Sequence, residues 1–175
     1  IISMIPNSIS LLRIGLIVPI IMALVFNAEK LSLILLFVAC ITDYFDGFTA
    51  RLMNKETPLG ANLDLLADKL LISSMFIFIP FHYDNLFILI MAIIIVCREI
   101  SVGILRNHYI SLGESDSAKV NFFGKFKTFF QMLSIFLCII FLDGSLNYIA
   151  EIFVFLACIF SVASLFSYVE LRKLK

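Results

Sequence analysis

Four aspartates stand inside apolar stretches of this sequence, where charged side chains are rare: Asp43, Asp46, Asp64 and Asp68. The first two are three residues apart and the last two are four apart, so each pair projects from one helical face. A charged side chain in a membrane costs at least ~2.5 kcal/mol on insertion scales. Oxygen-preferring divalent cations would neutralise the cluster and keep the carboxylates ionised. The spacing therefore predicts two Mg²⁺ or Mn²⁺ ions, an arrangement that recurs in phosphoryl transfer.

Small and basic residues continue the same helical faces: Gly47, Ala50, Arg51 and Gly60. Taken alone, Gly47 and Ala50 are more often helix-packing residues, and Arg51 is more often a residue whose head reaches the membrane surface. Beside four aspartates, the small residues leave room for a ligand, and Arg51 offers a fixed fork of donors for phosphate oxygens. The pattern favours a phosphate-bearing ligand.

Long apolar runs must position these residues. The chain has 175 residues, of which 62% are hydrophobic and 15% charged, and its mean hydropathy is +1.08. This composition excludes a water-soluble globule. Each bilayer crossing takes about 20 apolar residues. We therefore expect a single all-α transmembrane domain over residues 1–175, with six transmembrane helices at about 9–26, 31–53, 60–81, 86–107, 126–142 and 146–169.

Lysines and arginines predict the orientation of these helices. If the N-terminus, the second and fourth connections and the C-terminus share one side, Lys30 is the only basic residue in the connections of the other side. Cytoplasmic segments carry the excess of Lys and Arg. Both termini are therefore predicted to be cytoplasmic, and the aspartate pairs to lie at similar depth in a cytoplasm-facing site.

Two other functional classes are alternatives to an enzyme. Intramembrane aspartates also serve ion-coupled transporters, but these usually show paired halves or broken helices, whereas the aspartates here occupy two adjacent helices. A non-catalytic structural membrane protein is the other alternative. Nucleic acid is not an expected partner, because the formal net charge is +0 and non-specific binding needs a basic excess.

The aspartates belong to one continuous pattern: Asp43-x-x-Asp46-Gly47-x-x-Ala50-Arg51, eight residues, then Gly60-x-x-x-Asp64-x-x-x-Asp68. This pattern resembles the signature of the CDP-alcohol phosphatidyltransferases at all eight specified positions. The resemblance implies a six-helix membrane protein that forms homodimers and keeps two metal ions in a polar cavity open to the cytoplasm. It also implies a reaction in which an acceptor hydroxyl attacks the lipid-proximal phosphate of a CDP-linked lipid and CMP leaves.

The resemblance also implies roles for the signature residues. Asp43, Asp46 and Asp64 are similar to the family's metal ligands, and Asp68 to the residue that shares the metals and acts as general base. The positions that hold the cytidine and diphosphate are matched by Gly47, Ala50, Arg51 and Gly60.

Three further segments, residues 5–13, 97–106 and 124–128, resemble the bacterial branch of the family whose acceptor is sn-glycerol 3-phosphate. This resemblance implies a bacterial inner-membrane protein that uses CDP-diacylglycerol and contacts membrane lipids. The acceptor is an anion and needs a basic pocket. The residues placed to supply it are Arg98, Arg106, Lys125 and Lys127.

Two alternatives remain for the acceptor site. Lys125, Lys127 and Arg106 would also suit a basic flank that meets lipid head groups. Related enzymes that use inositol phosphate, serine or phosphatidylglycerol would share the signature and differ only in the acceptor pocket. Arg98 lies within an apolar run, where a charged residue is a functional candidate.

Overall fold

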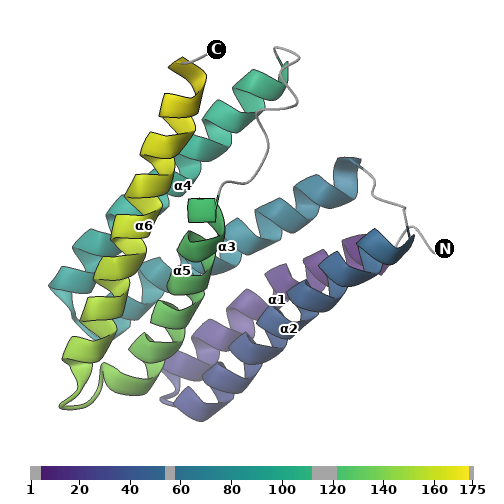
Figure 1. Cartoon of the computed structure of the whole chain (residues 1–175). Helices are drawn as coiled ribbons and strands as arrows, with labels where there is room; N and C mark the ends of the chain where they lie inside the picture. The colour runs from purple at the N-terminus through teal and green to yellow at the C-terminus, as the bar shows by residue number, and fades with distance from the viewer. Residues whose placement is uncertain (1–4, 54–57, 112–121, 174–175) are drawn as a thin grey trace. The chain divides into compact units, whose positions relative to one another are not determined.

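The computed structural model describes the backbone of residues 5–53, 58–111 and 122–173, and side chains within residues 10–42, 63, 65–105 and 126–166. Six helices account for nearly all of it (Figure 1), which confirms the predicted all-α class. They are α1 (Ile5–Val25), α2 (Glu29–Met53), α3 (Pro58–His82), α4 (Leu86–Ser111), α5 (Phe122–Phe141) and α6 (Asn147–Lys173).

Several helices extend beyond the predicted apolar runs. α4 continues to Ser111 and α5 begins at Phe122, so the fourth connection is shorter than its polar composition indicates. The physical reason is that polar residues continue the backbone hydrogen bonds of a helix after its apolar face has ended. α3 begins at Pro58, two residues before the predicted start. Proline suits a first helical turn, whose N–H groups have no partner within the helix.

Two tight connections end α1 and α3 in the same way. Asn27 and Asp84 adopt positive φ angles of 55° and 51°, which Asn and Asp tolerate better than most residues. Each is followed by a hydrogen bond that closes the preceding helix, from Ala28 N to Ala23 O at 2.8 Å and from Asn85 N to Pro80 O at 3.0 Å. This pair of features is the Schellman motif of helix C-termini.

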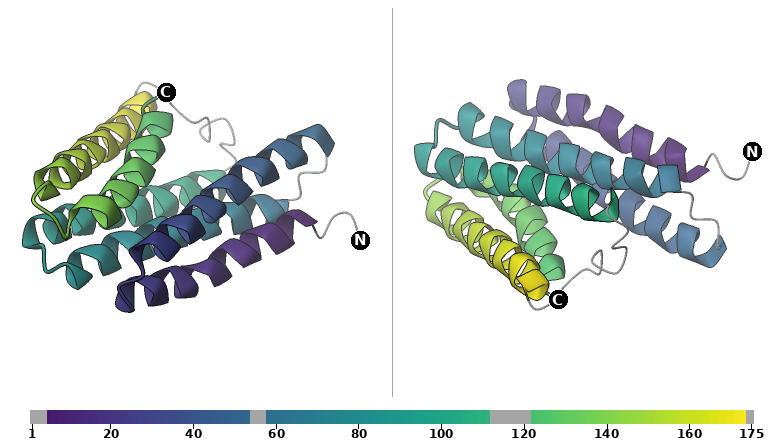
Figure 2. Two further views of the ribbon diagram at one scale, coloured as in Figure 1. Left: turned by 90° about the horizontal axis from the view of Figure 1, so that it is seen from below. Right: turned by 90° about the horizontal axis from the view of Figure 1, so that it is seen from above.

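The helices form two compact units, residues 1–78 and residues 79–175. In the first unit α1 packs along α2 (Figure 1), with Ile20, Leu24 and Leu36 fully buried. In the second unit α6 packs against both α4 and α5 (Figure 2), where Ile139 and Val154 are fully buried. The boundary between the units falls within α3.

The apolar side chains on the surface of the helices indicate the environment in which this protein lies. Among the described residues, three segments are long and apolar enough to cross a membrane, Leu65–His82, Leu86–Leu105 and Asn147–Phe166. Shorter apolar segments occur in α1 and α5, at Ser10–Val25 and Phe126–Phe141. Large apolar side chains are exposed on these helices, and water would not favour such a surface. The chain is therefore an integral membrane protein, as the composition predicts.

Candidate functional site

The signature residues lie on the helical backbone of α2 and α3 in the first unit. α2 ends at Met53 and α3 begins at Pro58. At a rise of ~1.5 Å per residue, Asp46 and Asp64 lie about 10 Å from these two ends, and Asp43 and Asp68 lie about 15 Å from them. Each aspartate on α2 thus has a counterpart on α3 at the same distance along its own helix.

Asp68 is the signature residue whose side chain the structure describes. Arg13 Nη1 of α1 donates a hydrogen bond to Asp68 Oδ1 at 2.6 Å, and the two side chains form an ion pair. Arg13 is fully buried, whereas 35% of the Asp68 side chain is exposed. The structure does not describe the side chains of the other signature residues. These residues are Asp43, Asp46, Gly47, Ala50, Arg51, Gly60 and Asp64.

The ion pair with Arg13 restricts the rotation of the Asp68 side chain. A charge-assisted hydrogen bond is roughly twice as strong as a neutral one, and a fully buried arginine has little freedom to follow a moving partner. Asp68 therefore presents a carboxylate that Arg13 holds in place and that remains partly exposed. The sequence analysis missed this contact, although a charged residue within the apolar run of α1 is a signal that could have identified Arg13 as a candidate.

Carboxylate oxygens are the donors that Mg²⁺ and Mn²⁺ prefer. Among the described side chains, no three Asp, Glu, His or Cys residues gather closely enough to hold a metal ion. Only Asp68 of the four aspartates belongs to that set. The donor chemistry of the signature and the exposure of Asp68 fit a divalent ion.

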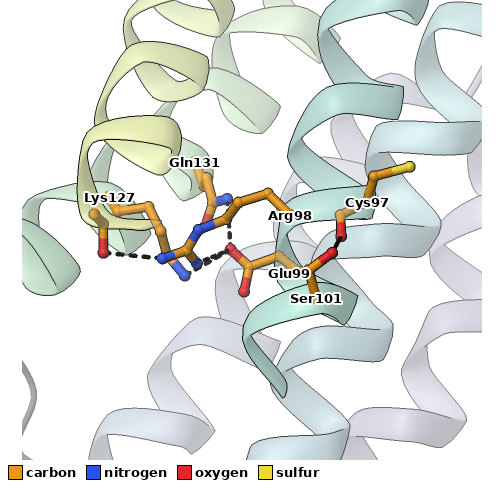
Figure 3. A network of polar contacts seen from close by, with 7 residues as sticks. Cys97, Arg98, Glu99, Ser101, Lys127 and Gln131 are labelled. Carbon is orange, nitrogen blue, oxygen red and sulfur yellow. Dashed lines mark hydrogen bonds and ion pairs between the residues drawn. The ribbon is translucent and has the colours of Figure 1, made fainter. Parts of the chain in front are cut away.

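A second polar cluster lies in the second unit and is buried (Figure 3). Glu99 of α4 accepts hydrogen bonds from its neighbour Arg98 at 3.1 Å and from Lys127 of α5 at 2.6 Å. Gln131, one helical turn after Lys127, donates to the same carboxylate at 3.2 Å. Arg98 also donates to Ser164 of α6 at 2.9 Å. We call these five residues the Glu99 cluster.

The cluster places two of the four predicted acceptor residues together. Arg98 and Lys127 are both buried and share the Glu99 carboxylate. A basic flank that meets lipid head groups would extend its charge to the surface, which Lys127 does not do. The side chains of Arg106 and Lys125 lie outside the described residues. Glu99, Gln131 and Ser164 are the polar residues here that sequence reasoning did not assign to the site.

Comparison with known proteins identifies the family. The family model for CDP-alcohol phosphatidyltransferase matches residues 3–163, a range that includes the signature and all residues of the Glu99 cluster except Ser164. The chain belongs to this family. The resemblance predicted from the signature is thereby confirmed, and this phosphatidyltransferase is an enzyme.

Named relatives share its sequence to different extents. A CDP-diacylglycerol–glycerol-3-phosphate 3-phosphatidyltransferase of Haemophilus influenzae is 31% identical over 147 residues, which are 84% of this chain and 80% of the relative. Proteins of the same name from Salmonella choleraesuis and Escherichia coli are 37% and 39% identical. Those two alignments cover 62% and 56% of this phosphatidyltransferase, and 59% and 54% of the relatives' own length.

Proposed function

We propose that this phosphatidyltransferase transfers the phosphatidyl group of CDP-diacylglycerol to sn-glycerol 3-phosphate, giving phosphatidylglycerophosphate and CMP. It would thus act in phospholipid biosynthesis as a phosphatidylglycerophosphate synthase. The names of the similar bacterial proteins support this acceptor. The structural observation that carries it is the burial of Arg98 and Lys127 around a single carboxylate. Two buried cations with one anion favour an additional anionic group, such as a phosphate.

Asp43, Asp46, Asp64 and Asp68 are the residues that would hold the two divalent ions. Their carboxylates are hard oxygen donors, and their helical spacing puts each pair on one face. When bound, such ions neutralise the negative charge of a diphosphate and of the departing CMP. Gly47, Ala50, Arg51 and Gly60 would accommodate the cytidine and the diphosphate, since small residues leave space and Arg51 supplies donors for phosphate oxygens.

Asp68 would be the general base. As the acceptor hydroxyl oxygen bonds to the lipid-proximal phosphorus, Asp68 takes the hydroxyl proton. The bond from that phosphorus to the oxygen of CMP breaks, and CMP leaves with the electron pair. The bond from Arg13 at 2.6 Å holds the base in one orientation, and the exposure of Asp68 leaves the carboxylate accessible to an incoming alcohol.

Arg98, Arg106, Lys125 and Lys127 would bind the acceptor's phosphate. Arg98 and Arg106 are eight residues apart on α4 and therefore share a helical face. Lys125 and Lys127 lie in the first turns of α5. A guanidinium binds a phosphate through two parallel N–H bonds, and an ammonium group adds a mobile positive charge.

We further propose six membrane crossings, with both termini and a polar cavity on the cytoplasmic side of a bacterial inner membrane, and a homodimer. The asymmetry of Lys and Arg supports this orientation. Single cysteines at Asn54 and Asn85, in a background with the four native cysteines replaced by alanine, test it. An impermeant thiol reagent should label position 54 only from the cytoplasmic side and position 85 only from outside. Labelling of both positions from outside would contradict the orientation.

The acceptor is tested directly with purified protein in detergent micelles. Radiolabelled CDP-diacylglycerol is offered with glycerol 3-phosphate, inositol phosphate, serine or phosphatidylglycerol in turn, and the lipid products are separated. We expect label in a new phosphorylated lipid only with glycerol 3-phosphate, with release of CMP in equal amount. Transfer to a different acceptor would refute the synthase assignment, and absence of transfer to all four would also refute it and would indicate an acceptor outside this set.

A further inference from the structure

Three donors converge on one oxygen of the Glu99 side chain (Figure 3). Glu99 Oε1 accepts from Arg98 Nη1 at 3.1 Å, from Lys127 Nζ at 2.6 Å and from Gln131 Nε2 at 3.2 Å. The donors come from two helices, α4 and α5, and both helices pack against α6. The position of this single carboxylate therefore determines where both cationic groups stand.

Ser164 fixes the cluster to the third helix. Arg98 Nη2 donates to Ser164 Oγ at 2.9 Å, so the guanidinium is held between Glu99 and α6. Arg98 Nε is buried and makes no hydrogen bond within the described part of the chain. A buried guanidinium with an unused donor retains the capacity to bind an anion, and its other contacts prevent it from turning away.

The Glu99 cluster has one more cation than it has anions. Arg98 and Lys127 carry two positive charges against the single carboxylate of Glu99, and all three side chains are at least nine-tenths buried. Without a counter-charge a flexible lysine would extend toward water, because an isolated buried charge is unfavourable. Within the five residues of the cluster, Glu99 provides enough negative charge to keep both cations inside, and the cluster keeps a net positive charge that suits an anionic ligand.

We propose that Glu99 is a positioning residue, which holds Arg98 and Lys127 in the arrangement that receives the acceptor's phosphate. The proposal rests on the proposed function and adds a residue to it. Glu99 itself does not touch the acceptor, since a carboxylate would repel a phosphate. Its effect is to place two donor groups before the acceptor arrives, so that binding does not have to order them.

The decisive variant is Glu99→Gln, which retains the shape of the side chain and removes its charge. Glu151→Gln is a matched control, because Glu151 also accepts an interhelical hydrogen bond, from Asn85 Nδ2 at 2.9 Å, but has no contact with the Glu99 cluster among the described residues. Michaelis constants for glycerol 3-phosphate and for CDP-diacylglycerol are measured separately for both variants and for the unaltered protein.

For Glu99→Gln we expect the Michaelis constant for glycerol 3-phosphate to rise about ten-fold or more, because two ion pairs become weaker hydrogen bonds from charged donors to a neutral amide oxygen. The constant for CDP-diacylglycerol and the turnover number at saturation should change less than two-fold. Glu151→Gln should leave both constants unchanged. Equal rises in the Michaelis constants for both substrates would show a purely structural role for Glu99. A lower Michaelis constant for glycerol 3-phosphate would show that Glu99 competes with the acceptor. Either result would overturn the proposal.

A second variant tests the proposal if Glu99→Gln does not fold, and the acceptor that the unaltered protein uses separates this proposal from the proposed function. If Glu99→Gln does not fold, Gln131→Leu removes one donor to Glu99 without altering a charge, and it should raise the same constant by about two- to five-fold; an unchanged constant would refute the proposal. If the unaltered protein uses a different phosphorylated acceptor, the synthase assignment fails, but Glu99→Gln should still raise the constant for that acceptor selectively. If it uses only acceptors without a phosphate, both proposals fail.

Discussion

The two compact units differ in the charge of their polar residues, with a proposed acidic cluster in the first unit and the Glu99 cluster in the second. In the first unit the signature supplies four aspartates and Arg51, and the structure adds Arg13 as the partner of Asp68. In the second unit Arg98 and Lys127 share the single carboxylate of Glu99. Acidic groups are therefore in excess in the first, proposed cluster, and basic groups in the second.

This difference indicates what each cluster lacks. An excess of buried or half-buried charge is unfavourable until a group of opposite sign compensates it. Divalent cations would compensate the aspartates, and a phosphate would compensate Arg98 and Lys127. The two imbalances thus match the two kinds of ligand that the proposed transfer would require, a metal-bound diphosphate and an anionic acceptor.

Removal of divalent ions should have the largest effect and should act through the first cluster. With excess chelator we expect no measurable transfer, because four carboxylates without cations repel each other and the diphosphate. Addition of Mg²⁺ or Mn²⁺ beyond the chelator should restore activity. Full activity at saturating chelator would mean that Arg13 and Arg51 suffice to balance the aspartates and that the first cluster needs no metal ion.

Asp68→Asn should reduce turnover by a factor on the order of 10² to 10⁴, the usual range for loss of a general base. Its metal requirement should change little, since Asp43, Asp46 and Asp64, which are expected to act only as metal ligands, all remain. Asp64→Asn serves as the contrast and should raise the metal concentration needed for half-maximal rate. Near-normal turnover of Asp68→Asn at saturating metal and substrate would show that Asp68 is not the base.

Arg98→Ala tests the basic excess of the second cluster. Each charge-assisted bond to phosphate is worth ~1.5 to 3 kcal/mol, so the Michaelis constant for glycerol 3-phosphate should rise about ten-fold or more. Lys127→Ala should also raise the Michaelis constant for glycerol 3-phosphate. In both variants the Michaelis constant for CDP-diacylglycerol should change little. Lys30→Ala, which removes an exposed charge remote from either cluster in the sequence, is the control. Unchanged acceptor constants in both cluster variants would exclude a phosphate pocket.

Arg13→Lys should have the smallest effect, because lysine keeps the charge next to Asp68 and loses only the rigid fork of donors. A loss of about 1 kcal/mol in orienting Asp68 corresponds to a roughly five-fold fall in turnover. The Michaelis constants for both substrates should be unaffected. A selective rise in the Michaelis constant for glycerol 3-phosphate would instead assign Arg13 to acceptor binding. The acceptor would then not be bound by the second cluster alone.

The sequence alone determined the helices and the signature, because both depend on local spacing. Six apolar runs predicted six helices, and the largest differences at their ends are extensions of four residues, at the start of α1 and α5 and at the end of α4 and α6. The intervals from Asp43 to Asp46 and from Asp64 to Asp68 set helical faces without reference to any other part of the chain. Family, reaction class and candidate metal ligands follow from that pattern.

Only the tertiary structure decided which charged groups meet. Arg13 and Asp68 are 55 residues apart, and Glu99 and Lys127 are 28 apart, so no helical period relates them. Whether Lys127 contacts lipid head groups or a buried carboxylate depends on how α4, α5 and α6 pack, and the hydropathy of α5 is the same in either case. The physical reason is that spacing within a helix is fixed by its own backbone, whereas a contact between helices depends on the rotation and axial position of each, which side-chain packing sets.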